Sequence, residues 1–330
     1  MTLKLGDRFG RVATDLRVSL TDRCNLRCSY CMPAEGLDWL PDEHTLADDE
    51  VVRLVRIAVR MLGVTEVRFT GGEPLVRRGL VDIVRRVHDL GGVETSLTTN
   101  ALGLARTARA LREAGLDRVN VSLDSIRRET FHEITRRDRL ADVVAGLEAA
   151  REVGLGPVKL NAVLLRGVND DQAPELLRWS IEHGYDLRFI EQMPLDAQHG
   201  WSRAQMVTAD EIFERLTAVF DLTPHSEPRG SAPAELFLVD GGPATVGVIA
   251  SVTRPFCGDC DRVRLTADGQ VRNCLFAREE SDLRAAMRAG ATDEELAQRW
   301  VVAMAGKRAG HGIDDPTFLQ PDRPMSAIGG

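Results

Sequence analysis

Apolar runs of strand length alternate with amphipathic helical patterns through the first two thirds of the chain. At 48–62, Val51, Leu54, Ala58 and Leu62 recur at helical spacing, and Gly63 follows where the helix would end. Further helical patterns cover 80–90, 104–114, a segment that ends at 154, and 174–183. Strand-like runs cover 16–20, 64–70, 93–99, 118–123, 158–165 and 185–192.

This alternation predicts an α/β fold with parallel strands and right-handed crossovers. The pattern alone fits a doubly wound sheet and an incomplete barrel equally well. After residue 193 it loosens and predicts a helix at 208–220, short strands around 244–252, a hairpin at Asp268–Gly269, and helices at 282–289 and 293–305. We therefore expect two regions, 1–193 and 194–330, the second an α+β region that closes the open side of the first.

Composition narrows the class of protein. The chain has 330 residues, of which 43% are hydrophobic and 28% charged, which is typical of a folded globular protein. Its first eleven residues have no apolar core of a signal peptide, and the chain has no uncharged run long enough to span a bilayer. We expect a cytoplasmic protein without membrane contact. The net charge of -8 argues against nucleic-acid binding, so an anionic substrate would need a local basic pocket.

All six cysteines fall in two triplets. In the first, Cys24, Cys28 and Cys31 are separated by three and then two residues in a short loop after the first strand-like run. Cysteine thiolates bind iron-sulfur clusters, and three of them leave one iron of a 4Fe-4S cubane open for a substrate or cofactor. Zinc and disulfides are the alternatives, but zinc sites favour paired C-x2-C ligands, and disulfide frameworks belong to small secreted domains.

The second triplet is Cys257, Cys260 and Cys274. A C-x2-C pair suggests half of a structural zinc site, which stays an alternative here. Carboxylates lie nearby at Asp259 and Asp261, yet no histidine or fourth cysteine completes a zinc set. A second 4Fe-4S cluster with its own open iron fits the triplet better.

The first triplet, with Tyr30 before its last cysteine, resembles the radical S-adenosylmethionine superfamily. The resemblance implies an incomplete (β/α)6 TIM-type barrel with its site at the carboxyl ends of the strands. It also implies that the open iron binds S-adenosylmethionine and that the cofactor supplies a 5'-deoxyadenosyl radical. Gly71-Gly72-Glu73-Pro74 would be only a tight turn by itself, but it resembles the GGEP motif of the superfamily. By the same resemblance, the cofactor would contact Tyr30, Gly72, Ser122 and Met193.

The run 255–269, together with Cys274-Leu275-Phe276, Met32-Pro33 and the terminal Gly329-Gly330, resembles the GTP 3',8-cyclases of molybdenum cofactor biosynthesis. This resemblance covers nearly the whole chain. It implies a lyase that takes the ribose C3' hydrogen of GTP and forms (8S)-3',8-cyclo-7,8-dihydroguanosine 5'-triphosphate. The second cluster would hold the guanine, and the Gly329-Gly330 tail would enter the active site. Ala101 and Asp261 depart from the family, which usually has glycine and asparagine there.

A triphosphate needs cations, and arginine forks match phosphate geometry. Arginine is common in this chain, whereas lysine occurs only at positions 4, 159 and 307, so Lys159 in a strand-like apolar run is conspicuous. Each of these cations fits a solvated strand face about as well as a binding site. The family resemblance implies that GTP contacts Arg17, Arg68, Thr98, Lys159, Arg262, Val263 and Arg264.

Two other functions remain open at this level. A peptide-modifying radical enzyme with an auxiliary cluster would need more cysteines in the carboxyl region. A zinc-stabilised interaction protein with a conjugated Gly-Gly tail would need a β-grasp domain before the tail, where the pattern is helical. The expected partners are GTP, an electron donor and the next enzyme of the pathway. The sequence does not decide whether the protein forms a homodimer.

Overall fold

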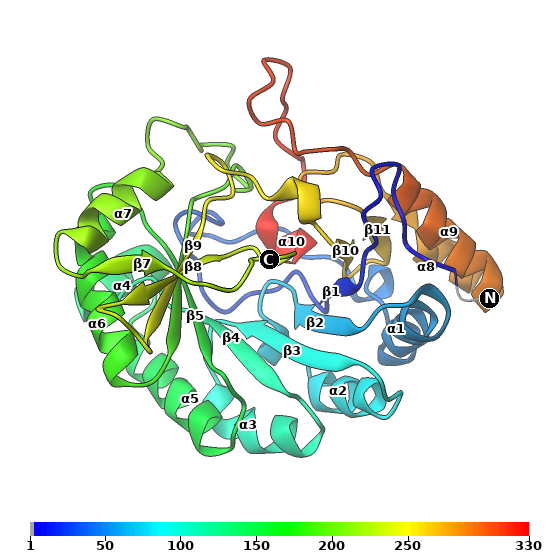
Figure 1. The fold of residues 1–330 in the computed structure, drawn as a ribbon. Coiled ribbons are helices and arrows are strands. Elements are labelled where there is room, and N and C mark those ends of the chain that lie inside the picture. The colour runs from blue at the N-terminus through cyan, green and yellow to red at the C-terminus, as the bar shows by residue number, and fades with distance from the viewer. Residues whose placement is uncertain (1–2, 330) are drawn as a thin grey trace.

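The computed structural model describes residues 3–329, and its strands join into one twelve-stranded sheet (Figure 1). The strands are β1 Asp15–Ser19, β2 Glu66–Thr70, β3 Glu94–Thr99, β4 Arg118–Ser122, β5 Lys159–Val163, β6 Asp186–Ile190, β7 Leu222–Pro224, β8 Glu235–Val239, β9 Thr245–Ile249, β10 Arg262–Leu265, β11 Gln270–Arg272 and β12 Ser281–Asp282. Their order across the sheet is β12-β11-β10-β1-β2-β3-β4-β5-β6-β9-β8-β7.

The six strands expected from the amino-terminal pattern lie side by side and parallel, from β1 to β6. The carboxyl-terminal region adds strands at both edges of this group. Strand β10 pairs parallel with β1, and β9 pairs parallel with β6. The expected hairpin at Asp268–Gly269 joins β10 to β11. The sheet therefore crosses the expected boundary at 193/194, and the division into two domains stays a prediction.

The helices are α1 Asp48–Leu62, α2 Leu80–His88, α3 Leu104–Glu113, α4 Arg128–Thr135, α5 Leu140–Glu152, α6 Ala173–Glu182, α7 Ala209–Thr217, α8 Leu283–Arg288, α9 Asp293–Ala305 and α10 Met325–Ile328, with 3-10 turns η1 Asp42–His44, η2 Pro74–Val76, η3 Asp170–Gln172 and η4 Cys257–Asp259. Helix α1 has its expected bounds, because Gly63 with φ 77° ends it in the left-handed region. Helix α4 was not expected, since its pattern merges with that of α5.

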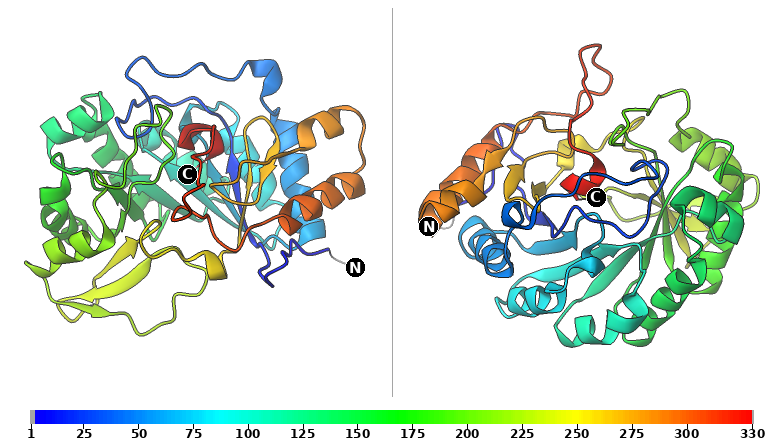
Figure 2. Two further views of the ribbon diagram at one scale, coloured as in Figure 1. Left: turned by 90° about the horizontal axis from the view of Figure 1, so that it is seen from above. Right: turned by 180° about the vertical axis from the view of Figure 1, so that it is seen from behind.

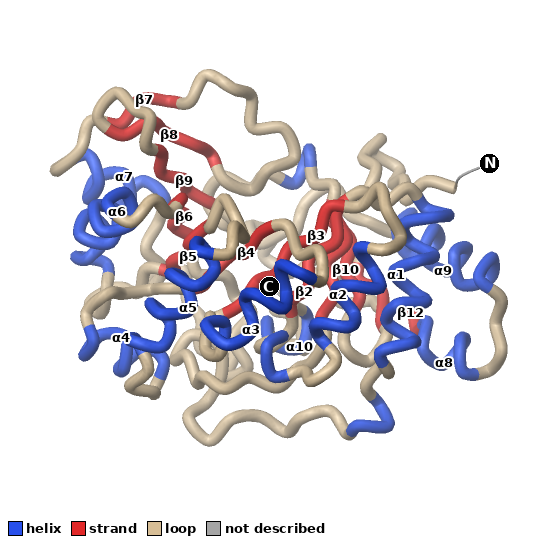
Figure 3. The backbone as a smooth tube through the Cα atoms, turned by 90° about the horizontal axis from the view of Figure 1, so that it is seen from below, coloured by secondary structure: helices blue, strands red, loops and turns tan. Residues whose placement is uncertain are grey.

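The helices surround the curved sheet, and α10 lies inside the curve. Figure 1 shows α1, α2, α3, α5 and α6 outside the strands and the red α10 at the centre. Figure 2 shows the carboxyl-terminal segment inside the curve from two further sides, and Figure 3 shows the surrounding helices from below. Among the described residues, no helix is long and apolar enough to cross a membrane.

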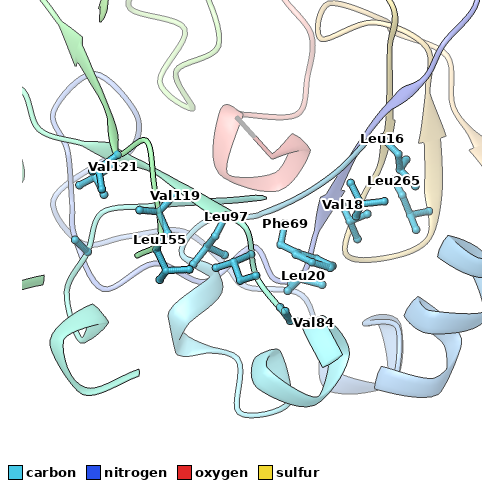
Figure 4. Packing of buried hydrophobic residues seen from close by; sticks show 14 of the residues in the cluster. Leu16, Val18, Leu20, Phe69, Val84, Leu97, Val119, Val121, Leu155 and Leu265 are labelled. Atoms are coloured by element: carbon cyan, nitrogen blue, oxygen red, sulfur yellow. The ribbon is translucent and has the colours of Figure 1, made fainter. Parts of the chain in front are cut away.

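The main core lies between the strands and the outer helices. Alternate residues of each parallel strand point toward the helices, such as Leu16 and Val18 on β1 and Phe69 on β2, and these are fully buried (Figure 4). The intervening residues point into the curve, and many of them are polar. Arg17 and Arg68 occupy such positions and are partners in the β1–β2 register. The concave side of the sheet therefore carries charged side chains, whereas the side that faces the helices is apolar.

Candidate active site

One cavity of about 350 Å³ lies on the concave side of the sheet. Both cysteine triplets line it, together with residues at the carboxyl ends of β2, β3, β4, β5 and β6. This is the edge at which parallel-barrel enzymes place their chemistry. The sequence-predicted residues that line it are Arg17, Cys24, Cys28, Tyr30, Cys31, Arg68, Gly72, Thr98, Ser122, Met193, Cys257, Cys260, Arg262, Arg264 and Cys274.

The loop that carries the first triplet is held by the end of α4. The amides of Arg27 and Ser29 donate to the carbonyls of Thr135 and Ile134 at 3.0 and 2.8 Å. The guanidinium of Arg136 donates to the Arg27 carbonyl at 2.8 Å and to that of Met32 at 3.0 Å. A short helix that the sequence pattern did not reveal thus fixes the backbone on both sides of Cys28 and Cys31.

The three thiols of this loop are free and partly buried. Burial raises the pKa of Cys24 to about 11 and the pKa of Cys31 to about 12, and it also raises the pKa of Cys28. Cys31 is further raised by its neighbour Cys24. A metal cation would offset this burial and favour the thiolate form of each side chain.

Gly71 and Gly72 let two loops approach closely. A Cβ on Gly71 would lie 2.4 Å from the carbonyl oxygen of Thr21, and one on Gly72 would lie 2.4 Å from that of Asp22. Gly71 also has φ 150°, which L side chains rarely adopt. The turn after β2 consequently lies against the segment that enters the cysteine loop.

Glu73 locks the same turn to the end of β3. Its carboxylate accepts hydrogen bonds from the Thr99 hydroxyl and the Asn100 amide, each at 2.7 Å, and from the Leu75 amide at 2.9 Å. Burial raises the pKa of Glu73 to about 7, although these three donors oppose the shift. The carboxylate is a structural tie between the turn and the strand.

Tyr30 is tied to the far side of the cavity through a residue that sequence reasoning missed. Its hydroxyl donates to Asp124 at 2.9 Å, and the other oxygen of Asp124 accepts from the Val163 amide at 2.8 Å. Burial raises the pKa of Asp124 to about 6. Asp124 lies two residues after Ser122, just past the end of β4, and it is buried. An acidic residue directly after an apolar strand is the one feature of the sequence that could have pointed to it.

The second triplet differs from the first in the cations that lie beside one of its thiols. Burial raises the pKa of Cys257. Burial also acts to raise that of Cys260, but the Lys307 ammonium and the Arg262 guanidinium outweigh it and lower the pKa of this thiol. Cys274 follows β11 and lines the cavity with the other two.

No three His, Cys, Asp or Glu side chains within residues 3–329 converge closely enough to hold a single metal ion. All six cysteines are nevertheless free and face one cavity. A cubane binds its cysteines at separate corners, so their sulfurs stand farther apart than the ligands around one zinc. The free thiols of both triplets are thus available to a cluster, and the choice between a cluster and zinc at the second triplet stays a prediction.

Four arginines on β1, β2 and β10 lie between the two triplets, because the first triplet follows the carboxyl end of β1, whereas Cys257 and Cys260 precede the amino end of its parallel neighbour β10. In the register of the sheet, Arg17 is the partner of both Arg68 and Arg264. Burial, and then neighbouring Arg17, lower the pKa of Arg68 and that of Arg264 to about 9. Two carboxylates lie within reach: Asp15 is 3.6 Å from Arg17 and 3.9 Å from Arg262, and Asp261 is 3.8 Å from Arg262. Because four cations face two carboxylates, this layer has an excess of positive charge that an anionic ligand would neutralise.

Several buried polar atoms in the same layer have no hydrogen-bond partner among the described residues. They are Arg17 Nε, Arg188 Nε, Asn161 Oδ1 and both amide atoms of Asn120. Buried polar groups are normally satisfied, so these atoms indicate where a ligand would bind. Arg188 was not predicted from the sequence. It lines the cavity from β6, where it stands between the apolar residues Leu187 and Phe189 as Arg17 stands between Leu16 and Val18 on β1.

The other expected GTP contacts are less direct. Thr98 lines the cavity from β3. Lys159 begins β5 and is half-buried, and within the described chain it is not part of the cavity wall. Burial, and then Arg188, lower the pKa of Lys159 to about 8. The Val263 side chain lies fully in the core, so any contact with a ligand would come from its backbone between Arg262 and Arg264.

The carboxyl-terminal tail enters the cavity from the concave side. Met325 and Ser326 line the cavity, and the Met325 amide donates to the Leu195 carbonyl at 2.9 Å. Gly329 has φ 86°, and a Cβ there would lie 2.7 Å from Cγ2 of Thr70. Gly330, expected to be catalytic, lies outside the described residues.

The two departures from the family pattern lie at the edges of the site. Ala101 is fully buried with φ 63°, a left-handed conformation that glycine adopts at lower cost. The Asp261 carbonyl accepts from the amides of Thr14 and Asp15, and its carboxylate lies 3.8 Å from the guanidinium of Arg262.

Comparisons with known proteins agree with this geometry. Residues 18–180 match the model of the radical SAM superfamily, and residues 185–313 match that of Molybdenum Cofactor Synthesis C. The GTP 3',8-cyclase of Streptomyces coelicolor is 68% identical over 98% of this chain and 96% of its own length. That of Mycobacterium sp. strain KMS is 65% identical over 99% and 93%.

Among solved structures, Streptococcus suis SuiB superposes with a TM-score of 0.62 at 15% identity, covering 92% of this chain and 68% of its own. At this identity the likeness shows the fold alone, and it confirms the expected incomplete barrel of the superfamily. The high identity of the cyclases over nearly their full length shows more. The chain belongs to the GTP 3',8-cyclase family of radical S-adenosylmethionine enzymes.

Proposed function

We propose that this protein converts GTP to (8S)-3',8-cyclo-7,8-dihydroguanosine 5'-triphosphate, an early step of molybdenum cofactor biosynthesis. The observation that carries the proposal is the arrangement of one cavity, which both thiol triplets line, with four arginines between the triplets that carry an excess of positive charge. A site for a redox cofactor and a site for a polyphosphate thus share one enclosed space. The relatives' identity favours this activity over peptide modification.

Cys24, Cys28 and Cys31 would hold the first 4Fe-4S cluster, with S-adenosylmethionine on its open iron. When bound, this pair supplies the radical that removes the ribose C3' hydrogen. Tyr30 would contact the cofactor from a position fixed by Asp124, and Gly72 would offer its backbone because no side chain intervenes. Ser122 and Met193 would line the remaining wall.

Arg17, Arg68, Arg262 and Arg264 would bind the triphosphate, with Lys159 near its far end and Thr98 beside the nucleoside. Guanidinium groups that repel one another when the site is empty gain free energy when phosphate oxygens pair with them. Arg188 belongs to this set by position. Fixed phosphates hold the ribose and base in one orientation, which favours the intramolecular C3'–C8 bond.

Cys257, Cys260 and Cys274 would hold a second 4Fe-4S cluster whose open iron anchors the guanine. Three thiols on the cavity wall, unpaired and without a converging fourth ligand in the described chain, support this assignment. The Gly329-Gly330 tail would complete the wall beside Arg264. The reaction also needs an electron donor, and its product passes to the next enzyme of the pathway.

The test is an anaerobic assay of the reconstituted chain with GTP, S-adenosylmethionine and dithionite. We expect 5'-deoxyadenosine and the cyclised nucleotide together, and about eight irons per chain, the sum of two cubanes. Cofactor cleavage without nucleotide cyclisation, in a chain that carries both clusters, would overturn the substrate assignment. About four irons with full cyclisation would overturn the second cluster alone.

A further inference from the structure

Lys307 is a buried lysine that the proposed reaction leaves without a role. It follows α9, and its side chain is 2% exposed. Its ammonium lies 2.8 Å from the Arg262 carbonyl and 3.3 Å from both the carbonyl and the sulfur of Cys260. Lysine occurs three times in this chain, and a buried position is the least favourable for it.

The buried ammonium of Lys307 needs an opposite charge nearby to compensate its loss of hydration. Burying an ammonium costs several kcal/mol unless an opposite charge compensates it. Within residues 3–329, no carboxylate forms an ion pair with this side chain, so the two carbonyls supply dipoles and the Cys260 sulfur is the anion within reach. A metal-bound thiolate would keep its negative charge, whereas a free thiol would not.

The two triplets differ in the donors that reach their sulfurs. The Cys24 sulfur accepts hydrogen bonds from the Leu26 amide at 3.4 Å and from the Asn100 side-chain amide at 3.8 Å, and both donors are neutral. The Cys260 sulfur accepts hydrogen bonds from the Lys307 ammonium at 3.3 Å and from the Arg262 guanidinium at 3.7 Å, and both donors are cationic. Hydrogen bonds and charges at ligand sulfurs are among the factors that set the reduction potential of a cluster.

We propose that Lys307 is a positioning residue that raises the reduction potential of the second cluster by donating a charged hydrogen bond to the Cys260 thiolate. The inference rests on the proposed second cluster. One-electron reduction, by dithionite in the test below, adds one negative charge to that cluster without breaking a bond. An ammonium fixed in a desolvated position beside one ligand stabilises the more negative state. The first cluster has no such donor among the described residues and keeps its potential.

The test is a potentiometric titration of the reconstituted full-length enzyme, followed by electron paramagnetic resonance. A variant with alanine at Cys24, Cys28 and Cys31 identifies the signal of the second cluster. We expect Lys307→Met to shift that signal to lower potential and to leave the signal of the first cluster in place. Lys307→Arg keeps the charge, so its second cluster should titrate closer to the parent.

Arg308→Met is the matched control, because it removes one positive charge from an exposed neighbouring side chain. It should leave both potentials unchanged. Where Lys307→Met loses iron, Lys307→Gln retains a neutral donor and should give the same downward shift. An unchanged second-cluster potential in either iron-loaded variant would overturn the inference. A parent with about four irons and one signal would instead contradict the proposed second cluster, since two cubanes need eight.

Discussion

The guanidinium of Arg264 donates a hydrogen bond to the backbone carbonyl of Gly329. This contact joins strand β10 to the last described residue of the chain and brings the tail into the layer of buried arginines. Ile328 and Gly329 are both buried. A tail that serves in conjugation must be free for another enzyme to reach, so its burial in the cavity argues against the ubiquitin-like alternative.

Deleting Gly329 and Gly330 should abolish cyclisation and leave the fold unchanged. The two residues have no side chains to contribute to the core, and α10 before them retains its hydrogen bonds to Pro324 and Leu195. Product formation and iron content are measured on the same anaerobic preparation. Gly329→Ala should have a similar effect, because its Cβ would meet Thr70 at 2.7 Å. Full turnover by either variant would exclude a catalytic position for the tail.

Arg323 anchors the segment before α10. Its guanidinium pairs with both oxygens of Asp268, at 3.1 and 2.7 Å, and with Glu280 at 2.8 Å. Arg323→Met should lower the free energy of unfolding by about 2 kcal/mol at pH 7, because it removes charge-assisted hydrogen bonds from a mostly buried carboxylate. The variant should also lose turnover, since the tail is no longer fixed. Arg278→Met, at an exposed position, is the control and should change stability by less than about 0.5 kcal/mol.

The same pair predicts a pH dependence. Burial acts to raise the pKa of Asp268, but the hydrogen bonds from Arg323 and Thr266 outweigh it and hold the pKa below the usual 3.8. A carboxyl group with a lowered pKa contributes stability that is complete above its ordinary value and is lost as the pH falls through the lower, folded value. Urea unfolding should thus separate the parent from Arg323→Met at pH 7, and the gap should narrow below pH 3.8. A gap that stays constant as the pH falls well below 3.8 would exclude the ion pair as its cause.

The sequence predicted the parts of this fold that are periodic and local. The bounds of α1 and α9 agree with the predicted helices, since a regular apolar face and an end signal define each. The pairing of β10 with β1 was not predictable, because the register of two strands more than two hundred residues apart leaves no local pattern. For this reason the carboxyl region was expected to cover the barrel, and its extension of the sheet was not foreseen.

The candidate site likewise contains residues that local sequence patterns identify and residues that they do not. The cysteines and Gly71-Gly72 have fixed spacing, so sequence reasoning found them. Asp124 and Arg188 have no spacing that identifies them, and their importance depends on what faces them across the cavity. Lys159 was conspicuous as a rare lysine, yet the structure places it at the start of β5, away from the cavity wall formed by the described residues.

Arg188→Met should weaken GTP binding more than guanosine binding. A charge-assisted hydrogen bond to phosphate accounts for about 1.5 to 3 kcal/mol, so GTP affinity should fall by roughly ten- to hundredfold. The gap between GTP and guanosine in the parent should itself shrink as salt screens the charges. Calorimetric titration measures both ligands, and Arg299→Met on the exposed face of α9 is the control. Equal losses for the two ligands would mean that Arg188 does not contact the phosphates.

Removing one thiol from each cysteine triplet should abolish different steps of the reaction. Cys28→Ser takes a ligand from the proposed first cluster, so cleavage of S-adenosylmethionine to 5'-deoxyadenosine should stop. Cys257→Ser leaves the three ligands of the first cluster untouched. It should therefore still produce 5'-deoxyadenosine slowly under reducing anaerobic conditions, while forming no cyclised nucleotide and binding GTP more weakly.

Structural zinc at the second triplet would give a different result, because such a site contributes directly to folding. Cys257→Ser would then unfold β10, β11 and the segments that pack on them, including the tail held by Arg264 and Arg323. A circular-dichroism melt beside the turnover assay separates the two cases. A well-folded Cys257→Ser protein that cyclises GTP at the parent rate would contradict a substrate-binding role for this triplet, and the arginines alone would then have to orient the nucleotide.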